Sequence, residues 1–434
     1  MDNSAAEHAM KIAFITPAAP GHLNPMTTVA RKLQSRNHDV VFITAPDGEP
    51  YVRAANLTFL PCVVKVVAAG SLKERPPWLK LQGEEALRAA LQNAPARTEA
   101  MLDSLPATLT AAGIDTVVID TSLIYAELAP MSLGLPYAHV ANALHHDYSG
   151  YTPICFYDWP HETTPAALAR NQKGVESFLE MLAPTIAVAR AYAKRAGLDI
   201  DWDNPTATIS KLAWITQTPR EFDFESSHWL PQFRYTGPFH DGAGRIEVDS
   251  PWEQLTGEPL IYASMGTMLD DLADVYRTII AATEKQKGVQ LVLSVGDELD
   301  PKQIGALPSN TILVKRAPQL ELLKRASVCI THAGLNTVLE SLAQGVPQVA
   351  IPVTVDQPGV AARIAEKKTG LFVPVKKLTV SRLSLLLDQV LHEPAYRDNA
   401  RYFQKVIAET DGLSRAADLL EESLGLTKNA AKES

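Results

Sequence analysis

A histidine and an aspartate each stand at the end of a short apolar run in the N-terminal half of the chain. His22 lies in the loop after the run KIAFITP, just before Asn24 and Pro25, which are predicted to be the N-cap and the first residue of a helix. Asp120 ends the run DTVVID. An imidazole can take the proton of an attacking alcohol, and a carboxylate on its other ring nitrogen would fix the tautomer and stabilise the imidazolium. His22 is therefore a candidate general base with Asp120 as its orienting partner, unless the two are merely a loop histidine and a helix cap.

A second group of polar residues lies in the segment THAGLNTVLESLAQGVPQVAIPVTVD, residues 331–356. A strand is predicted to end there and to pass through Gly334 into a helix. The first turn of a helix presents unpaired N–H groups and a positive dipole end, which suits a diphosphate. His332 and Thr337 would add hydrogen-bond donors, and Glu340, one turn beyond Thr337, would accept from the hydroxyls of a ribose. The plainer alternative is an ordinary capped helix with a loop histidine beside it.

The elements that would position these residues alternate between strand and helix. Strands are predicted at 11–17, 39–45, 115–120, 137–140, 260–267, 290–295, 311–315, 328–331 and 348–352, and helices at 26–36, 123–133 and 271–287. This alternation predicts an α/β fold of two doubly wound, Rossmann-like domains that face each other across a cleft, with ligands bound at the carboxyl ends of the strands.

The domain boundaries follow from where the alternation stops. Residues 226–257, rich in Pro, Gly and aromatic side chains, are predicted to link an N-terminal Rossmann-like domain at 1–225 to a C-terminal Rossmann-like domain at 258–410. A helix at 411–426 is predicted to cross back to the N-terminal domain, and the polar residues 427–434 are predicted to be a disordered tail.

The composition excludes several classes of protein. At 434 residues the chain exceeds what one hydrophobic core usually organises, and a net charge of −9 with no block of Lys or Arg argues against a nucleic-acid partner. The absence of GxGxxG after the first strand, and of GxxxxGK followed by Ser or Thr, disfavours dinucleotide and P-loop sites. No apolar run is long enough to span a bilayer and no leader-like segment opens the chain, which predicts a cytoplasmic protein. Three widely spaced cysteines are predicted to be reduced core residues: Cys62, Cys155 and Cys329.

The stretch RAPQLELLKRASVCITHAGLNTVLESLAQGVPQVAIPVTVDQPG resembles the donor-binding signature of family 1 glycosyltransferases, the UDP-glycosyltransferase superfamily with the GT-B fold. Within that family it looks closest to bacterial macrolide-type and zeaxanthin glucosyltransferases. The motifs PAAPGHLNPM, VVIDTSLIYAELAPMSLGLP and YASMGT also fit, so the resemblance extends over nearly the whole chain. It implies an inverting transfer of a hexose, glucose above all, from a UDP-sugar to a hydroxyl, with His22 as base and Asp120 as its partner. No cofactor or metal is expected, and Asp270 with Asp271 is predicted to start a helix rather than to bind a metal.

The residues that the resemblance assigns to the donor all lie in the C-terminal half. They are Thr267, His332, Gly334, Asn336 and Thr337 for the diphosphate, Glu340 for the ribose, Gln319 and the backbone beside it for the nucleobase, and Asp356 and Gln357 for the sugar hydroxyls. One position departs from the family pattern. Many relatives have an aromatic residue three positions before Gln319 that stacks on uracil, whereas this chain has Arg316, whose planar guanidinium can also stack.

Aromatic residues gather in two irregular stretches of the N-terminal half, 63–82 and 142–164. Aromatic loops near a cleft suit a large apolar acceptor, although ordinary core packing is the alternative for each residue. The candidates for acceptor contact are Trp78, Tyr148, Phe156 and Trp159, and His145 and His146 could assist. Carotenoid, terpenoid, polyphenol and macrolide acceptors all stay open. So do the UDP or dTDP form of the donor and the oligomeric state.

Two other functions are compatible with the same architecture. A non-hydrolysing UDP-sugar 2-epimerase would share the donor, but it would use several acidic residues around the sugar in place of one histidine and an aromatic acceptor region. A noncatalytic, glycosyltransferase-like activator would keep the fold without the chemistry, and the presence of both His22 and Asp120 argues against it.

Overall fold

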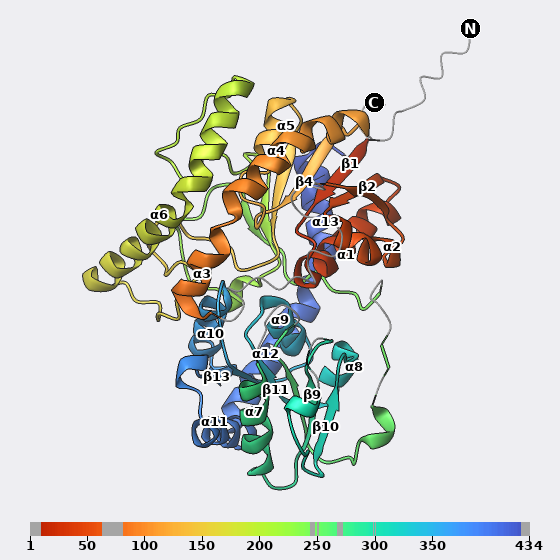
Figure 1. Ribbon diagram of the computed structural model, residues 1–434, viewed down its shortest axis with the longest axis vertical. Coiled ribbons are helices and arrows are strands. Elements are labelled where there is room, and N and C mark those ends of the chain that lie inside the picture. The colour runs from red at the N-terminus through yellow and green to blue at the C-terminus, as the bar shows by residue number, and fades with distance from the viewer. Residues whose placement is uncertain are drawn as a thin grey trace.

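The computed structural model of the chain describes residues 10–62, 81–243, 248–249, 251–266, 272–297, 299 and 301–426. These residues form two α/β domains, one above the other in Figure 1, and each is built on its own parallel sheet. Most of the strands are buried on both faces, which explains why their sequences are nearly continuous apolar runs such as KIAFI and ASVCIT. The predicted tail at 427–434 lies outside the described residues.

The N-terminal domain contains a seven-stranded sheet in the order β3-β2-β1-β4-β5-β6-β7. Its strands are β1 (Lys11–Ile15), β2 (Asp39–Thr44), β3 (Thr58–Pro61), β4 (Thr116–Asp120), β5 (Tyr137–Ala141), β6 (Trp214–Thr216) and β7 (Phe233–Tyr235). Its helices are α1 (Pro20–Ser35), α2 (Glu49–Ala54), α3 (Gly83–Leu91), α4 (Ala94–Ala111), α5 (Leu128–Ser132) and α6 (Pro165–Ala196).

The C-terminal domain contains a six-stranded sheet in the order β10-β9-β8-β11-β12-β13. Its strands are β8 (Leu260–Ser264), β9 (Gln290–Ser294), β10 (Thr311–Val314), β11 (Ala326–Thr331), β12 (Gln348–Ala350) and β13 (Gly370–Phe372). Its helices are α7 (Ala273–Glu284), α8 (Gln319–Leu323), α9 (Leu335–Ala343), α10 (Gln357–Glu366), α11 (Val380–His392) and α12 (Pro394–Thr410), and α13 (Gly412–Ser423) follows α12.

Both sheets reverse their strand order at one point. The reversal falls between β1 and β4 in the first sheet and between β8 and β11 in the second. Ligands of open α/β sheets bind outside the carboxyl ends of the strands at such points. His22 follows β1, Asp120 is the last residue of β4, and His332 follows β11, so the candidate residues stand at both switch points.

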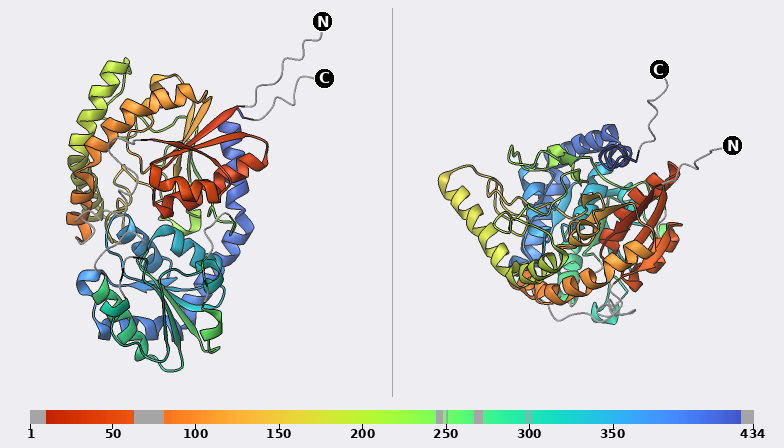
Figure 2. Two further views of the ribbon diagram at one scale, coloured as in Figure 1. Left: turned by 45° about the vertical axis from the view of Figure 1, so that its right-hand side comes forward. Right: turned by 90° about the horizontal axis from the view of Figure 1, so that it is seen from above.

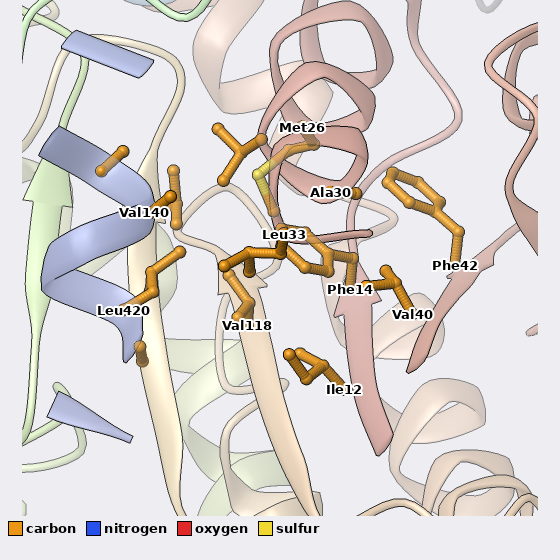
Figure 3. Close-up of a cluster of buried hydrophobic side chains, with 14 of the residues drawn as sticks. Ile12, Phe14, Met26, Ala30, Leu33, Val40, Phe42, Val118, Val140 and Leu420 are labelled. Carbon is orange, nitrogen blue, oxygen red and sulfur yellow. The ribbon is translucent and has the colours of Figure 1, made fainter. Parts of the chain in front are cut away.

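The last helix, α13, belongs to the N-terminal domain in space. Figures 1 and 2 show it lying beside α1, and Figure 3 shows Leu420 of α13 in one cluster with Val118 and Val140 of the sheet. The chain crosses over at Gly412, where an added Cβ would lie 2.4 Å from the carbonyl carbon of Gly237, so that only glycine fits. Ion pairs from Arg36 add to the contact.

The structure corrects three of the sequence predictions. Helix α1 begins at Pro20, so His22 lies in its first turn instead of in a loop, and the predicted N-cap at Asn24 is wrong. Proline is well suited to the first turn of a helix because the N–H that it lacks has no intrahelical acceptor there. The predicted linker at 226–257 begins too early, since it contains β7, which completes the first sheet. The helix predicted at 123–133 is reduced to α5, preceded by turns.

The two domains share a hydrophobic cluster. Leu144, Cys155 and Phe222 of the N-terminal domain pack with α9, α10 and α12. Cys155 also accepts a backbone hydrogen bond from Gly359 of α10 at 2.9 Å. The domain interface is therefore a packed one, and side chains from both sheets reach a common site.

Candidate active site

His22 and Asp120 meet where the neighbouring strands β1 and β4 end. Nδ1 of His22 lies 2.8 Å from Oδ2 of Asp120. The carboxylate is completely buried and also accepts hydrogen bonds from the hydroxyl of Thr16 at 2.8 Å, the side-chain amide of Asn142 at 2.9 Å and the backbone N–H of Ser122 at 2.9 Å. These donors fix the carboxylate, and the carboxylate in turn fixes one nitrogen of the imidazole, so that Nε2 is the atom able to meet a substrate.

The electrostatics of this pair suit proton transfer. Burial alone would lower the pKa of His22, but the negative charges of Asp120 and Asp356 outweigh it and raise the pKa above the usual 6.5. Burial would likewise raise the pKa of Asp120, but His22 and the hydrogen bonds from Ser122 and Asn142 lower it to about 2. Asp120 is therefore ionised at neutral pH and stabilises a proton on the ring.

His332 follows β11 and lies between two glycines. A Cβ added to Gly266, after β8, would lie 2.8 Å from Nε2 of His332, and a Cβ added to Gly334 would lie 2.5 Å from the same atom. The backbone turns into α9 through Ala333, whose φ is 66°. Burial lowers the pKa of His332 to about 4 against the opposing effect of a hydrogen bond with the Ser264 backbone, so the ring is neutral at pH 7.

The first turn of α9 is not capped by its own side chains. Gly334 is the N-cap and has no side chain to offer. The amide of Asn336, predicted to contact the diphosphate, instead donates to the carbonyl of Gly21 in α1 and accepts from Gln217 at 2.6 Å. Thr337 accepts from Gln319 at 3.3 Å. The side-chain cap expected in the plainer alternative is therefore wrong, and the predicted contact of Asn336 and Thr337 with a diphosphate stays a prediction.

The half-buried Gln319 and the buried Glu340 form a hydrogen-bonded pair behind the helix tip. Glu340 is 3% exposed and accepts from Nε2 of Gln319 at 2.7 Å, while Oε1 of Gln319 accepts from the hydroxyl of Tyr262 at 3.0 Å. The Gln319 side chain thus orients the carboxylate predicted to bind ribose, and the backbone beside it is left for the predicted nucleobase contact. Arg316 donates from Nε to Asp297 at 2.8 Å, an ion pair that sets the plane of the guanidinium.

The start of α10 reaches the N-terminal domain. The carboxylate of Asp356 accepts from the backbone N–H of Leu144 at 2.9 Å. Oε1 of Gln357 accepts from the backbone N–H groups of Val353 at 2.9 Å and Thr354 at 3.1 Å, which turns its NH₂ group into the available donor. Thr267, predicted to meet the diphosphate, and Trp78, predicted to meet the acceptor, lie outside the described residues.

Comparison with known proteins identifies the family of the chain. The family model "UDP-glucoronosyl and UDP-glucosyl transferase" matches residues 147–409. The chain belongs to this family. It is 25% identical over 421 residues to the NDP-glycosyltransferase YjiC of Bacillus subtilis, covering 94% of this chain and 96% of that protein. It is 27% identical over 422 residues to the zeaxanthin glucosyltransferase of Pantoea ananas, covering 94% and 95%.

The fold is also that of solved glycosyltransferases. The crystal structure of the glycotransferase of kitacinnamycin matches with a TM-score of 0.74 at 22% identity, covering 95% of this chain and 98% of that one. The family and the GT-B fold expected from the sequence are thus confirmed. The protein is a glycosyltransferase that takes a nucleotide-sugar donor.

The described aromatic residues that were predicted to contact the acceptor divide into two groups. Phe156 packs on Phe178 of α6 with ring centroids 4.5 Å apart, and His146 lies against both rings and beside the hydroxyl of Tyr148. Burial lowers the pKa of His146 to about 4, so it is a neutral member of this cluster. Trp159 instead stacks on Tyr157 at 3.9 Å, outside that contact.

Sequence analysis named His145 only as a residue that could assist at the acceptor, and it missed the partners of His145 altogether. His145 is fully buried and bonds to Asp223 at 2.8 Å, and Asp223 also pairs at 2.7 Å with Arg363 of α10. This ion pair crosses the domain interface, and nothing in the local sequence of either partner points to the other. Gln217, likewise, is recognisable only from the structure.

Further ligands are not indicated by the described residues. Among them, no group of three or more His, Cys, Asp or Glu side chains could hold a metal ion, while Asp270 and Asp271 lie outside that part of the chain. No helix within the described ranges is both long and apolar enough to cross a membrane. The predicted absence of a metal and the predicted cytoplasmic location both stay predictions.

Proposed function

We propose that this glycosyltransferase moves a hexose, glucose in the first instance, from its UDP-sugar to a hydroxyl of an apolar small molecule, with inversion at the anomeric carbon. The observation that carries the proposal is the His22–Asp120 pair, with Nδ1 and Oδ2 2.8 Å apart at the switch point of the N-terminal sheet. A histidine held in this way can act as a general base at neutral pH.

In the proposed reaction, Nε2 of His22 takes the proton of the acceptor hydroxyl as its oxygen attacks the sugar C1. The bond from C1 to the diphosphate oxygen breaks on the opposite face, and its electron pair leaves with UDP. Asp120 stabilises the imidazolium that forms. The negative charge that develops on UDP meets the uncapped N–H groups at the start of α9 and the N–H of His332.

The proposed donor and acceptor rest on separate observations. The carboxylate of the buried Glu340 can accept hydrogen bonds from the hydroxyls of a ribose. The planar guanidinium of Arg316, which Asp297 holds in place, can stack on a pyrimidine base. The similarity to a protein named NDP-glycosyltransferase makes dTDP-glucose the donor to compare with UDP-glucose. The aromatic cluster around Phe178 and the similarity to a zeaxanthin glucosyltransferase support an apolar acceptor, for which Tyr148, Phe156 and Trp159 are the proposed contacts.

The test is the variant His22→Ala, assayed with UDP-glucose and with dTDP-glucose against a panel of carotenoids, macrolides, flavonoids and steroids by mass spectrometry. We expect turnover to fall by on the order of 10²- to 10⁴-fold, while the Kd of UDP changes little. The matched control His392→Ala removes an exposed histidine of α11 and should leave turnover unchanged. Unchanged turnover in His22→Ala would remove the proposed base. Conversion of UDP-glucose in the absence of any acceptor would point to an epimerase, and failure of the parent enzyme with every acceptor would favour a noncatalytic role.

A further inference from the structure

Helix α1 carries a proline in its interior that leaves one carbonyl without its helical donor. Pro25 has no N–H, so the carbonyl of Gly21, four residues earlier, cannot accept the usual hydrogen bond. The side-chain amide of Asn336, at the second position of α9, donates to this carbonyl instead. Because His22 directly follows Gly21, the contact joins the backbone beside the proposed base to the helix whose tip faces the leaving group.

The same amide closes a circuit of hydrogen bonds around the base. Nε2 of Gln217 donates to Oδ1 of Asn336 and to the carbonyl of Asn142, both at 2.6 Å. Nδ2 of Asn142 donates to Oδ2 of Asp120 at 2.9 Å, and that oxygen lies 2.8 Å from Nδ1 of His22. The circuit thus returns to the residue next to Gly21.

The circuit is built from groups that are costly to leave unpaired. Gln217 is 2% exposed, Asn142 is 1% exposed and Asp120 is fully buried. An unpaired polar group in such a position costs on the order of 1–3 kcal/mol, so these side chains resist leaving their places. Asn336 is the member that belongs to the other domain, and it is held from both sides by Gly21 and Gln217.

We infer that Asn336 is a positioning residue, which fixes the His22 helix against the α9 tip through the carbonyl that Pro25 leaves without a helical donor. This inference rests on the proposed role of His22 as the base. The base and the leaving group are carried by different domains, so the distance between them depends on contacts across the interface. A displacement of the base by about 1 Å from its productive position can lower the rate by on the order of 100-fold. A contact that fixes this position therefore contributes to catalysis.

The test uses Pro25→Ala, a substitution that touches neither ligand and restores an N–H four residues after Gly21. In this variant the Gly21 carbonyl can bond within α1, and Asn336 loses its acceptor. We expect kcat to fall by on the order of 10- to 100-fold with an unchanged Kd for UDP. The melting temperature should not fall, because alanine is favoured over proline inside a helix. Asn336→Ala should lower kcat to at least a similar extent, and the double variant should be no slower than Asn336→Ala alone, because both substitutions remove the contact between Asn336 and Gly21.

Two further measurements separate this inference from the proposed function. Pro106→Ala, the same exchange inside α4, should leave kcat unchanged. The acid limb of the pH profile should keep its midpoint in Pro25→Ala, because the bond from His22 to Asp120 is untouched. An unchanged kcat in Pro25→Ala, or additive losses in the double variant, would overturn the positioning role even if His22→Ala is inactive. Full activity in His22→Ala would overturn the proposed base itself.

Discussion

The ion pair between Asp223 and Arg363 is buried at the domain interface, and its removal should weaken the whole molecule. Nε of Arg363 lies 2.7 Å from Oδ1 of Asp223, and the two side chains are 2% and 0% exposed. The other carboxylate oxygen accepts from His145 at 2.8 Å and from Tyr235 at 2.7 Å. Although burial alone would raise the pKa of Asp223, Arg363 and His145 hold it well below its usual value.

The substitution Arg363→Met keeps an unbranched apolar stem but leaves the carboxylate of Asp223 without its cation. Removing one partner of a buried pair costs about 3–5 kcal/mol, whereas removing both charges is often nearly neutral. We therefore expect Arg363→Met to lower the free energy of unfolding by about 3–5 kcal/mol, and Asp223→Asn combined with Arg363→Met to recover most of that loss. The control Arg382→Met removes an exposed arginine of α11 and should change stability by less than about 0.5 kcal/mol.

Urea unfolding followed by circular dichroism and tryptophan fluorescence measures these differences. The pH dependence supplies an independent check. Because the folded pKa of Asp223 lies below its unfolded value of 3.8, the stabilisation is present above that pH and is lost as the pH falls. The difference in stability between the parent and Arg363→Met should therefore begin to narrow as the pH falls below about 4. A loss smaller than about 1 kcal/mol in Arg363→Met at pH 7, or a double variant as unstable as the single one, would refute the reasoning.

Two further predictions concern the active site directly. In the parent, kcat/KM should rise with pH through a pKa above 6.5 as His22 loses its proton, and in Asp120→Asn this acid limb should move to lower pH, because the carboxylate that raises the pKa is gone. The plateau should fall by on the order of 10²- to 10⁴-fold, and a pH profile of Asp120→Asn that matches the parent would contradict the assignment. In Gly334→Ala, the new Cβ would stand 2.5 Å from Nε2 of His332, so the ring must move, and the Kd of UDP measured by calorimetry should rise by on the order of 10- to 100-fold. An unchanged Kd would show that His332 does not contact the diphosphate.

Much of the architecture was predictable because buried parallel strands appear in a sequence as short, nearly continuous apolar runs. The strands β1, β4 and β11 are short apolar runs, and a side chain at the end of each is brought to one edge of its sheet. The proximity of His22 and Asp120 follows from this rule once β1 and β4 are neighbours. The start of α1 was mispredicted because Pro25 was interpreted as the first residue of a helix, although that position is occupied by Pro20.

Contacts that cross the interface could not be predicted in the same way. Asp223 and Arg363 are separated by 140 positions, and Gly21 and Asn336 by 315, so no local period relates them. The strand β7 was missed because it has only three residues and lies among prolines and aromatic side chains, which break the alternation of a longer strand. Such features depend on how the two domains pack against each other. The spacing of apolar residues within one segment carries no information about that packing.

The polar groups around the base differ in charge for a physical reason. Two carboxylates, those of Asp120 and Asp356, already raise the pKa of His22. A third carboxylate at position 336 would raise that pKa further, keep the ring protonated at neutral pH and repel a diphosphate at the tip of α9. A neutral amide can hold the Gly21 carbonyl without either effect. A carboxylate is therefore suited to the position of Asp120, where the imidazolium must be stabilised. A neutral amide is suited to the position of Asn336, where the distance between the domains must be set.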